Sequence, residues 1–173
     1  VLVNPSYKDD SIFTSQDIRL VSVQAVSIDR AGKTVSTADG KTHAYDKLVL
    51  ATGAQPVRPP ISGIDLPGVF TLRTSGDAFA ILNWMNSNRI DDAVLIGGGA
   101  IGVEIAYLTA QKGVRLTLVE MLPHILQAAL DPDMSEGVEN CMREAGIDLR
   151  LGRRVERIQG RERPETVLLD SGA

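Results

Sequence analysis

The segment of residues 94–120 constrains the fold of this chain more than any other. An apolar strand leads into a GxGxxG pattern formed by Gly97, Gly99 and Gly102. A helix follows, and a second apolar strand ends on the acid Glu120. Strand, glycine loop, helix, strand and acid in this order and spacing are typical of a dinucleotide-binding βαβ unit. The sequence therefore predicts a parallel βαβ unit that binds a dinucleotide.

There is a physical reason for each residue type at its position in this pattern. Gly97 permits a tight turn, Gly99 lets the backbone approach a pyrophosphate, and Gly102 lets the helix pack close to the sheet. The pyrophosphate is expected on the unpaired N–H groups at the helix start. Glu120 is placed to accept hydrogen bonds from an adenosine ribose and to repel a 2′-phosphate, which favours NAD(H) over NADP(H). The alternative is a glycine-rich turn that binds nothing.

Composition excludes several classes of protein. The 173 residues suffice for one sizeable domain or two small ones, and 43% hydrophobic with 23% charged residues indicates a soluble globular chain. A net charge of −4 gives no reason to expect nucleic acid or an anionic membrane as a partner. No apolar run approaches the roughly 20 residues of a membrane span. The single cysteine excludes an internal disulfide and a cysteine metal cluster.

An internal repeat indicates two related domains. Residues 17–40 resemble residues 148–172, with DIRL over DLRL, VQAV over VERI and TV over TV in the same order. Each copy predicts a short strand followed by a small β-meander. The first copy continues into an apolar strand at 47–53, whereas the second begins with its own glycine loop. The glycine loop of the first copy is therefore expected upstream of Val1, and both domains are expected to be truncated.

Two further helices are expected between and after these motifs. Residues 53–68 are rich in proline and glycine, which indicates an extended linker. The first helix has Ser75 as its expected N-cap, and Trp84 is interpreted as a packing residue. Its expected apolar face comprises Ala78, Phe79, Leu82 and Met85.

The second helix is expected to begin at Asp131-Pro132 and to end near Gly146. Cys141 on its apolar stripe is expected to be a buried, inert thiol. We expect His43 and His124 to be solvated surface residues, because neither has a partner at catalytic spacing. The expected stripe comprises Met134, Val138, Cys141, Met142 and Ala145.

Several motifs together resemble the FAD-dependent pyridine nucleotide–disulfide oxidoreductases. They are YDKLVLATG at 45–53, GIDLPGVFTLR at 63–73, GGGAIGVE at 97–104 and VEMLP at 119–123. The resemblance covers essentially the whole chain and is nearest to the NADH oxidase and coenzyme A-disulfide reductase branch. It implies a Rossmann-like α/β fold in three layers, a parallel sheet with helices plus a β-meander.

The resemblance also implies a division of the chain. Residues 1–58 correspond to the C-terminal part of an FAD-binding domain, with the meander and the 47–53 strand. Residues 59–74 form a linker, and residues 75–173 form an NAD(H)-binding domain that lacks its last strand. The redox-active cysteine of such enzymes is expected upstream of Val1, so no catalytic residue is assigned here. A cytoplasmic homodimer, joined through a C-terminal domain absent from this sequence, is expected.

In this family hydride passes from NADH to FAD and on to a disulfide, dioxygen or a similar acceptor. Glu104 is expected near the nicotinamide end. The expected NAD(H)-binding residues are Gly97, Gly98, Gly99, Ala100, Ile101, Gly102, Glu104 and Glu120. The expected FAD-binding residues are Val23, Ala51, Thr52, Gly53 and Arg73.

Each role carried over from the family has a structural alternative. Glu104 gains from the helix dipole without any ligand, and Val23 fits the core of a meander. Thr52-Gly53 is also a strand-ending turn, and Arg73 is also a solvated linker charge.

Two other functions remain open for the protein as a whole. One is an NAD(H)-binding or redox-sensing module without turnover. The other is an electron-transfer enzyme similar to rubredoxin or ferredoxin reductases, with a small redox protein as acceptor. A second GxGxxG followed by a cysteine, upstream of Val1, would favour the enzyme over the module.

Overall fold

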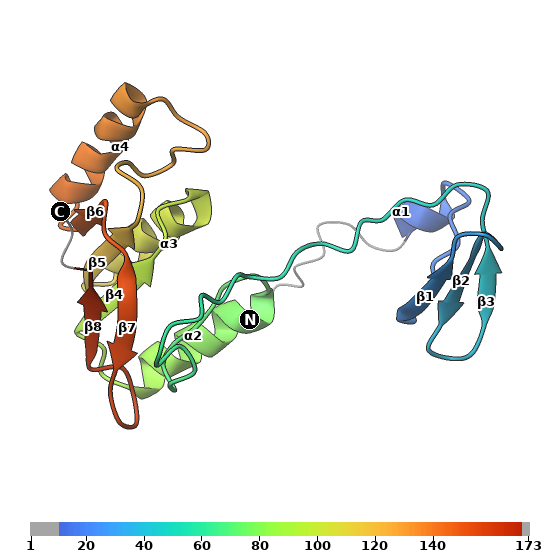
Figure 1. The fold of residues 1–173 in the computed structure, drawn as a ribbon, viewed down its shortest axis with the longest axis horizontal. Coiled ribbons are helices and arrows are strands. Elements are labelled where there is room, and N and C mark those ends of the chain that lie inside the picture. Colours follow the sequence, from blue (N-terminus) through green and yellow to red (C-terminus); the bar gives the residue numbers. More distant parts are fainter. Residues whose placement is uncertain (1–10, 171–173) are drawn as a thin grey trace. The chain divides into compact units, whose positions relative to one another are not determined.

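The structure is a computed structural model that describes residues 11–170. The chain forms two compact units, Val1–Ala54 and Gln55–Ala173. The helices are α1 (Ser11–Thr14), α2 (Ser75–Ser87), α3 (Ala100–Ala110) and α4 (Pro132–Glu144). The strands are β1 (Ala25–Asp29), β2 (Thr34–Thr37), β3 (Thr42–Ala44), β4 (Asp92–Ile96), β5 (Arg115–Glu120), β6 (Asp148–Leu151), β7 (Val155–Gln159) and β8 (Thr166–Leu169) (Figure 1).

The first unit contains the expected β-meander. Strands β1, β2 and β3 form an antiparallel sheet in that order, in which Val35 pairs with Ile28 on one side and His43 on the other. His43 is half-buried, with its Nδ1 3.2 Å from Arg19 Nη2 and its Nε2 3.4 Å from Thr37 Oγ1. His43 is therefore partly covered and in contact with two side chains, rather than solvated as expected.

Three strand predictions in the first unit are also wrong. Residues 17–20 are not a strand, and Asp17 has a positive φ of 55°. Val23 precedes β1, which begins at Ala25. The apolar segment 47–53 runs without strand pairing, and Val49 is 85% exposed. A strand requires a neighbour for its backbone groups, and no described segment pairs with this one.

The second unit is built on a parallel sheet with strand order β4-β5-β6. Leu95 pairs with Leu118, and Leu118 pairs with Leu149, so the three strands are in register. Side chains alternate across β5, as in any strand. Leu116 and Leu118 face a core shared with α3 and α4, whose buried members are Ala106, Leu116, Leu118, Ile125, Met142 and Ile147.

The opposite face of the sheet carries the β7–β8 hairpin. Val119 of β5 is buried with Val155 and Ile158 of β7 in a second cluster. Helices, parallel sheet and hairpin therefore form three layers, and the α/β Rossmann-like fold class is confirmed. Figure 1 shows β7 and β8 as a separate hairpin beside the parallel strands.

The segment expected as a linker contributes to this second core. Ile61, Ile64, Leu66 and Val69 pack against the cluster, and Ile158 N–H donates to Ser62 O at 2.8 Å. Backbone contact is so close that a Cβ on Gly63 would lie 2.0 Å from Ile158 O. Much of the segment 59–74 is thus a fixed part of the second unit, which begins at Gln55.

The two hairpins share an irregularity that supports the internal repeat. Both β1–β2 and β7–β8 shift register after the first pair of the hairpin, between Ala25 and Ser27 in one and between Val155 and Arg157 in the other. The connecting turns differ, since residues 30–33 join one hairpin and residues 160–165 the other. In the alignment of the two sequence copies, Ile158 matched Val26. In the structure, Ile158 occupies the same place in its hairpin as Ile28, because the second turn is longer, and the alignment is corrected accordingly.

Helix boundaries follow the expected capping chemistry with one shift. The N-cap of α2 is Thr74 rather than Ser75, because Thr74 and Asp77 form a reciprocal capping box. Trp84 packs against Phe70 with ring centroids 5.9 Å apart, which confirms its packing role. The expected apolar face of α2 is only partly covered, since Phe79 is 43% and Leu82 39% exposed.

Helix α4 begins after Asp131 with Pro132 in its first turn, and Gly146 follows its end in a left-handed conformation, as expected. Its buried face overlaps the expected apolar stripe only in part, because Met142 of that stripe is buried and Val138 packs against the core. The buried residues are Ser135, Glu139 and Met142, whereas Met134 and Cys141 are exposed. The expectation of a buried Cys141 is therefore wrong. No helix among residues 11–170 is long and apolar enough to cross a membrane.

Candidate dinucleotide-binding site

The glycine loop connects the end of β4 to the start of α3. Gly97 has a φ of +108°, a region that side chains disfavour, and its N–H donates to Val119 O at 2.8 Å. This conformation turns the chain sharply out of the strand. The turn expected at Gly97 is present.

The remaining glycines of the loop differ in what surrounds them. A Cβ on Gly102 would lie 2.1 Å from Gly97 O, so close packing of the helix requires glycine there. A Cβ on Gly98 would lie 2.7 Å from Ile125 Cγ2. Around Gly99 a Cβ would meet nothing within 4 Å. Gly99 therefore borders open space, whereas Gly98 and Gly102 are enclosed by protein.

That open space lies at the start of α3, where the backbone offers donors. Gly99 is the N-cap of α3, and no side chain caps the helix. The first N–H groups of a helix have no partner within it, and the helix dipole adds a partial positive charge. Gly99, Ala100 and Ile101 are all exposed. The arrangement suits an anion such as a pyrophosphate.

Glu120 ends β5 directly beside this loop. Its Oε2 accepts from Gly98 N–H at 2.6 Å, and its Oε1 accepts from Leu122 N–H at 2.8 Å. An ionised carboxylate has about four acceptor positions. Two of them remain for hydroxyl groups such as those of a ribose. The Glu120 carboxylate therefore holds the glycine loop through the bond to Gly98 N–H. The sequence pattern did not predict this contact.

Two of the other expected site residues make few contacts of their own. Glu104 lies in the second turn of α3 and is exposed. Arg73 is exposed, and its backbone N–H donates to Asp77 Oδ2 at 3.0 Å. That bond and two from Thr74 hold the pKa of Asp77 below its usual range, with the Thr74 N–H as the largest cause. The structure thus uses the backbone of Arg73 in the capping of α2.

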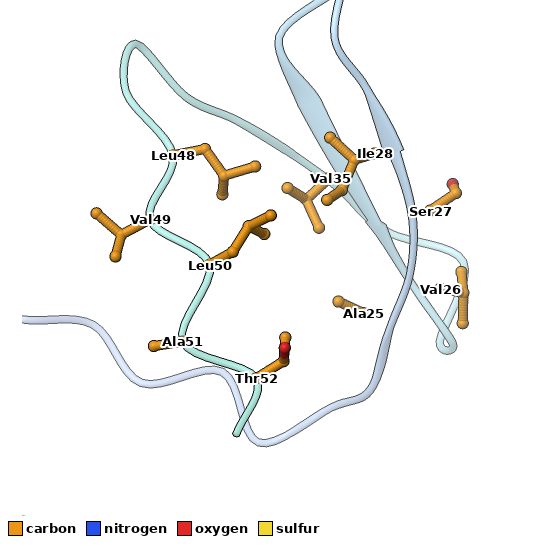
Figure 2. A pocket seen from close by; sticks show the side chains of 10 residues that line it. All are labelled: Ala25, Val26, Ser27, Ile28, Val35, Leu48, Val49, Leu50, Ala51 and Thr52. Atoms are coloured by element: carbon orange, nitrogen blue, oxygen red, sulfur yellow. The ribbon is translucent and has the colours of Figure 1, made fainter. Parts of the chain in front are cut away.

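The first unit has an apolar groove of about 490 Å³ beside its sheet. Figure 2 shows Leu48, Leu50 and Thr52 pointing toward Ile28 and Val35 across this groove, whereas Val49 and Ala51 point away. The full lining comprises Ala25, Val26, Ser27, Ile28, Val35, Leu48, Val49, Leu50, Ala51 and Thr52.

Four of the expected FAD residues belong to the same unit as this groove. Ala51 and Thr52 line it, and Gly53 follows with a φ of 74°. Val23 is not among the lining residues, because it lies two positions before β1.

His124 has a partner that sequence reasoning missed. Its Nδ1 lies 3.1 Å from Oε1 of Glu139, a carboxylate that is 3% exposed. The expectation of a solvated surface role for His124 is therefore wrong. Ser135, Glu139 and Met142 lie on one face of α4 at helical spacing, but hydrophobicity does not mark that face as buried. In the described part of the chain no group of acids, histidines or cysteines could hold a metal ion.

A parallel βαβ unit with an open glycine loop, an uncapped helix start and an acid at the end of the second strand defines a dinucleotide-binding domain. The comparison with known families agrees with this class. Residues 10–173 match the family described as pyridine nucleotide-disulphide oxidoreductase, and the chain belongs to that family.

Individual relatives extend this comparison. The chain is 45% identical over 126 residues to an NADH oxidase of Methanocaldococcus jannaschii, which covers 73% of this chain and 28% of that protein. It is 37% identical over 153 residues to a CoA-dependent NAD(P)H sulfur oxidoreductase of Pyrococcus abyssi, which covers 88% of this chain and 34% of that protein. The chain thus spans about a third of the length of these curated relatives.

A solved structure supports the same fold. The crystal structure of a ferredoxin reductase from Rhodopseudomonas palustris superposes with a TM-score of 0.87 at 32% sequence identity. The match covers 96% of this chain and 41% of that chain. This ferredoxin reductase therefore shares the fold of the chain.

Proposed function

We propose that this chain supplies the NAD(H)-binding site, and part of the FAD site, of a flavoprotein oxidoreductase. Hydride passes from NADH to FAD and then to a disulfide, a sulfur compound, dioxygen or a similar acceptor. The observation that carries the proposal is the open space at Gly99, beside the uncapped start of α3 and the carboxylate of Glu120. Membership in the family supports the flavin.

In this proposal each element of the second unit has one role. The N–H groups that open α3, from Gly99 to Gly102, bind the pyrophosphate of NAD(H). Glu120 accepts hydrogen bonds from the adenosine ribose and disfavours a 2′-phosphate. Glu104 lies further along α3 toward the nicotinamide.

The first unit fits part of the flavin site. Thr52 is the polar side chain that points into the apolar groove, and Ala51 and Thr52 line one edge of it, with Gly53 following next in the chain. Such a groove suits a flat, largely apolar group of FAD. Bound FAD would accept hydride from NADH and pass electrons singly or in pairs. Val23 and Arg73 are kept as proposed flavin contacts on the family resemblance alone.

The cofactor preference tests this proposal directly. In the full-length protein under anaerobic conditions, NADH should bleach the visible absorbance of the flavin and give a higher kcat/KM than NADPH. Glu120→Arg should shift the kcat/KM ratio toward NADPH, because a guanidinium can pair with the 2′-phosphate. Glu144→Arg makes the same charge change at an exposed position on α4 and should leave the ratio unchanged. A parent protein that prefers NADPH would contradict the role of Glu120.

A small redox protein is the second candidate acceptor. The ferredoxin reductase of R. palustris, with its TM-score of 0.87, favours this reading for the fold as a whole. Turnover of NADH with ferredoxin or rubredoxin, compared with turnover on dioxygen, elemental sulfur and coenzyme A disulfide, separates the two. Binding of NADH without flavin reduction or turnover would instead indicate a non-catalytic module.

A further inference from the structure

Behind the glycine loop lies a group of polar contacts that the proposed binding chemistry does not use. Glu139 of α4 is 3% exposed, and its Oε1 accepts from Ile125 N–H at 3.3 Å and lies 3.1 Å from His124 Nδ1. Its Oε2 lies 3.5 Å from Arg143 Nη2, one helical turn further on. A buried carboxylate is costly unless it is paired and hydrogen-bonded. These partners meet that requirement.

The residues that Glu139 holds are in direct contact with the glycine loop. Ile125 is fully buried, and its Cγ2 occupies the space that a side chain on Gly98 would need. Leu126 N–H donates to Gly98 O at 2.8 Å. Leu126 has a φ of 54°, which is a strained conformation for a bulky residue and persists only where surrounding contacts impose it. The loop after β5 is thus fixed on one side by α4 and contacts Gly98 on the other.

Gly98 is consequently held at both ends. Its carbonyl accepts from Leu126 N–H, and its N–H donates to Glu120 Oε2 at 2.6 Å. The next residues along the chain, Gly99 and Ala100, begin α3. The position of Gly98 therefore sets where the free N–H groups of α3 point.

We propose that Glu139 is a positioning residue for the dinucleotide site. It fixes residues 124–126 against Gly98 and so preorganises the anion-binding start of α3 before NAD(H) arrives. The proposal rests on the proposed function, because it names the support of that same site. It predicts an effect on NAD(H) affinity and none on hydride transfer once the dinucleotide is bound.

The test compares Glu139→Ala, Glu139→Gln and Glu136→Ala in the full-length flavoprotein. Glu136 lies on the same helix and is exposed, so its variant controls for loss of an acid from α4. We expect Glu139→Ala to raise the Kd and KM for NADH by about 10-fold, with kcat at saturating NADH and flavin content unchanged. Glu139→Gln keeps an acceptor for Ile125 N–H and should fall between the parent and Glu139→Ala. Glu136→Ala should bind NADH like the parent.

Hydrogen exchange without NADH provides a readout that does not depend on binding or turnover. In Glu139→Gln the amides of Gly98 and Leu126 should exchange faster than in the parent, while those of the β7–β8 hairpin should not change. Parent-like NADH affinity and parent-like exchange in Glu139→Gln would overturn the proposal. Faster exchange across the whole second unit would also overturn it, because Glu139 would then be a general stability residue. Failure of the parent to bind NADH would contradict the proposed function but not the exchange prediction.

Discussion

The consecutive glycines that open α3 are required for different physical reasons. Gly98 is enclosed by Ile125 and Glu120, whereas Gly99 borders open space. Gly99 has a φ of −74°, which any residue adopts without strain. A methyl group therefore conflicts with protein at Gly98 and meets open space at Gly99.

This contrast gives a matched pair of substitutions. Gly98→Ala should lower stability by about 1–3 kcal/mol, because the methyl group overlaps Ile125. Gly99→Ala should leave the melting temperature near that of the parent and weaken NADH binding, because the methyl group occupies the path of the pyrophosphate. Thermal unfolding and equilibrium titration with NADH measure the two effects. Unchanged NADH affinity in Gly99→Ala would contradict the placement of the pyrophosphate.

Cys141 is placed on the side of α4 away from Glu139. Two residues along a helix correspond to roughly 200° of rotation, and Cys141 is exposed while Glu139 is buried. Cys141→Ala should therefore leave turnover and NADH affinity at parent values, measured by steady-state kinetics and titration. If the variant is folded and contains flavin but loses activity, the prediction is wrong and the Cys141 thiol takes part in turnover.

At the scale of elements, α2 depends on its capping box. Asp77 accepts from the backbone of Thr74 and Arg73 and from the Thr74 hydroxyl, and these bonds lower its pKa. A lowered folded-state pKa means that this stabilisation is complete above the usual carboxyl range and is lost as the pH falls through the folded value.

Asp77→Asn should accordingly lower the melting temperature by about 2–4 °C at neutral pH. The difference from the parent should shrink as the pH is lowered through the carboxyl range, because the parent loses the same charge. Thermal scans from pH 7 downward measure this. A difference that stays constant with pH would exclude the carboxylate charge as its cause.

Helix α4 carries a glycine that its fold does not need. Gly137 lies in the middle of the helix, is exposed, and would place a Cβ in open space. Gly137→Ala should raise the stability by about 0.5–1 kcal/mol through helix propensity. A rise in melting temperature with unchanged NADH affinity is the expected result, and a fall would show that a part of the protein outside residues 11–170 packs on this face.

The boundaries of α3 and α4 could be predicted from the sequence, because residues close in the chain determine where a helix begins and ends. The start of α4 after Asp131, with Pro132 in its first turn, and the left-handed Gly146 after its end follow from local conformational preferences, and Asp131 makes no side-chain capping bond. Sequence reasoning failed where the partner is distant in the chain. The buried face of α4 is more polar than the stripe chosen from hydrophobicity, because Glu139 satisfies groups on the loop after β5. Periodicity alone does not contain that information.

At the scale of the molecule, the order of strand, glycine turn, helix, strand and acid in the βαβ unit could be predicted, because these elements follow one another within residues 92–120. The bond from Gly98 N–H to Glu120 Oε2, which joins the two ends of this unit, could not be predicted. The segment 47–53 could not be predicted correctly, since a strand forms only when a neighbour pairs with it. Val23 was misplaced because the β1–β2 pairing, and not the sequence repeat, sets where β1 begins.

The internal repeat of the sequence corresponds to one structural element that both units contain. Each has an antiparallel hairpin with a register shift at its first step. In the second unit this hairpin covers the face of the parallel sheet opposite α3 and α4. The shared register shift therefore agrees with the internal repeat of the sequence.

The most direct test of the central claim is a crystal structure of the full-length protein with NADH. We predict that pyrophosphate oxygens lie within hydrogen-bonding distance of the N–H groups at the start of α3, next to Gly99. The hydroxyl groups of the adenosine ribose should lie against the carboxylate of Glu120, which keeps its bond to Gly98 N–H. A dinucleotide bound elsewhere, with the space at Gly99 filled by solvent, would contradict the account.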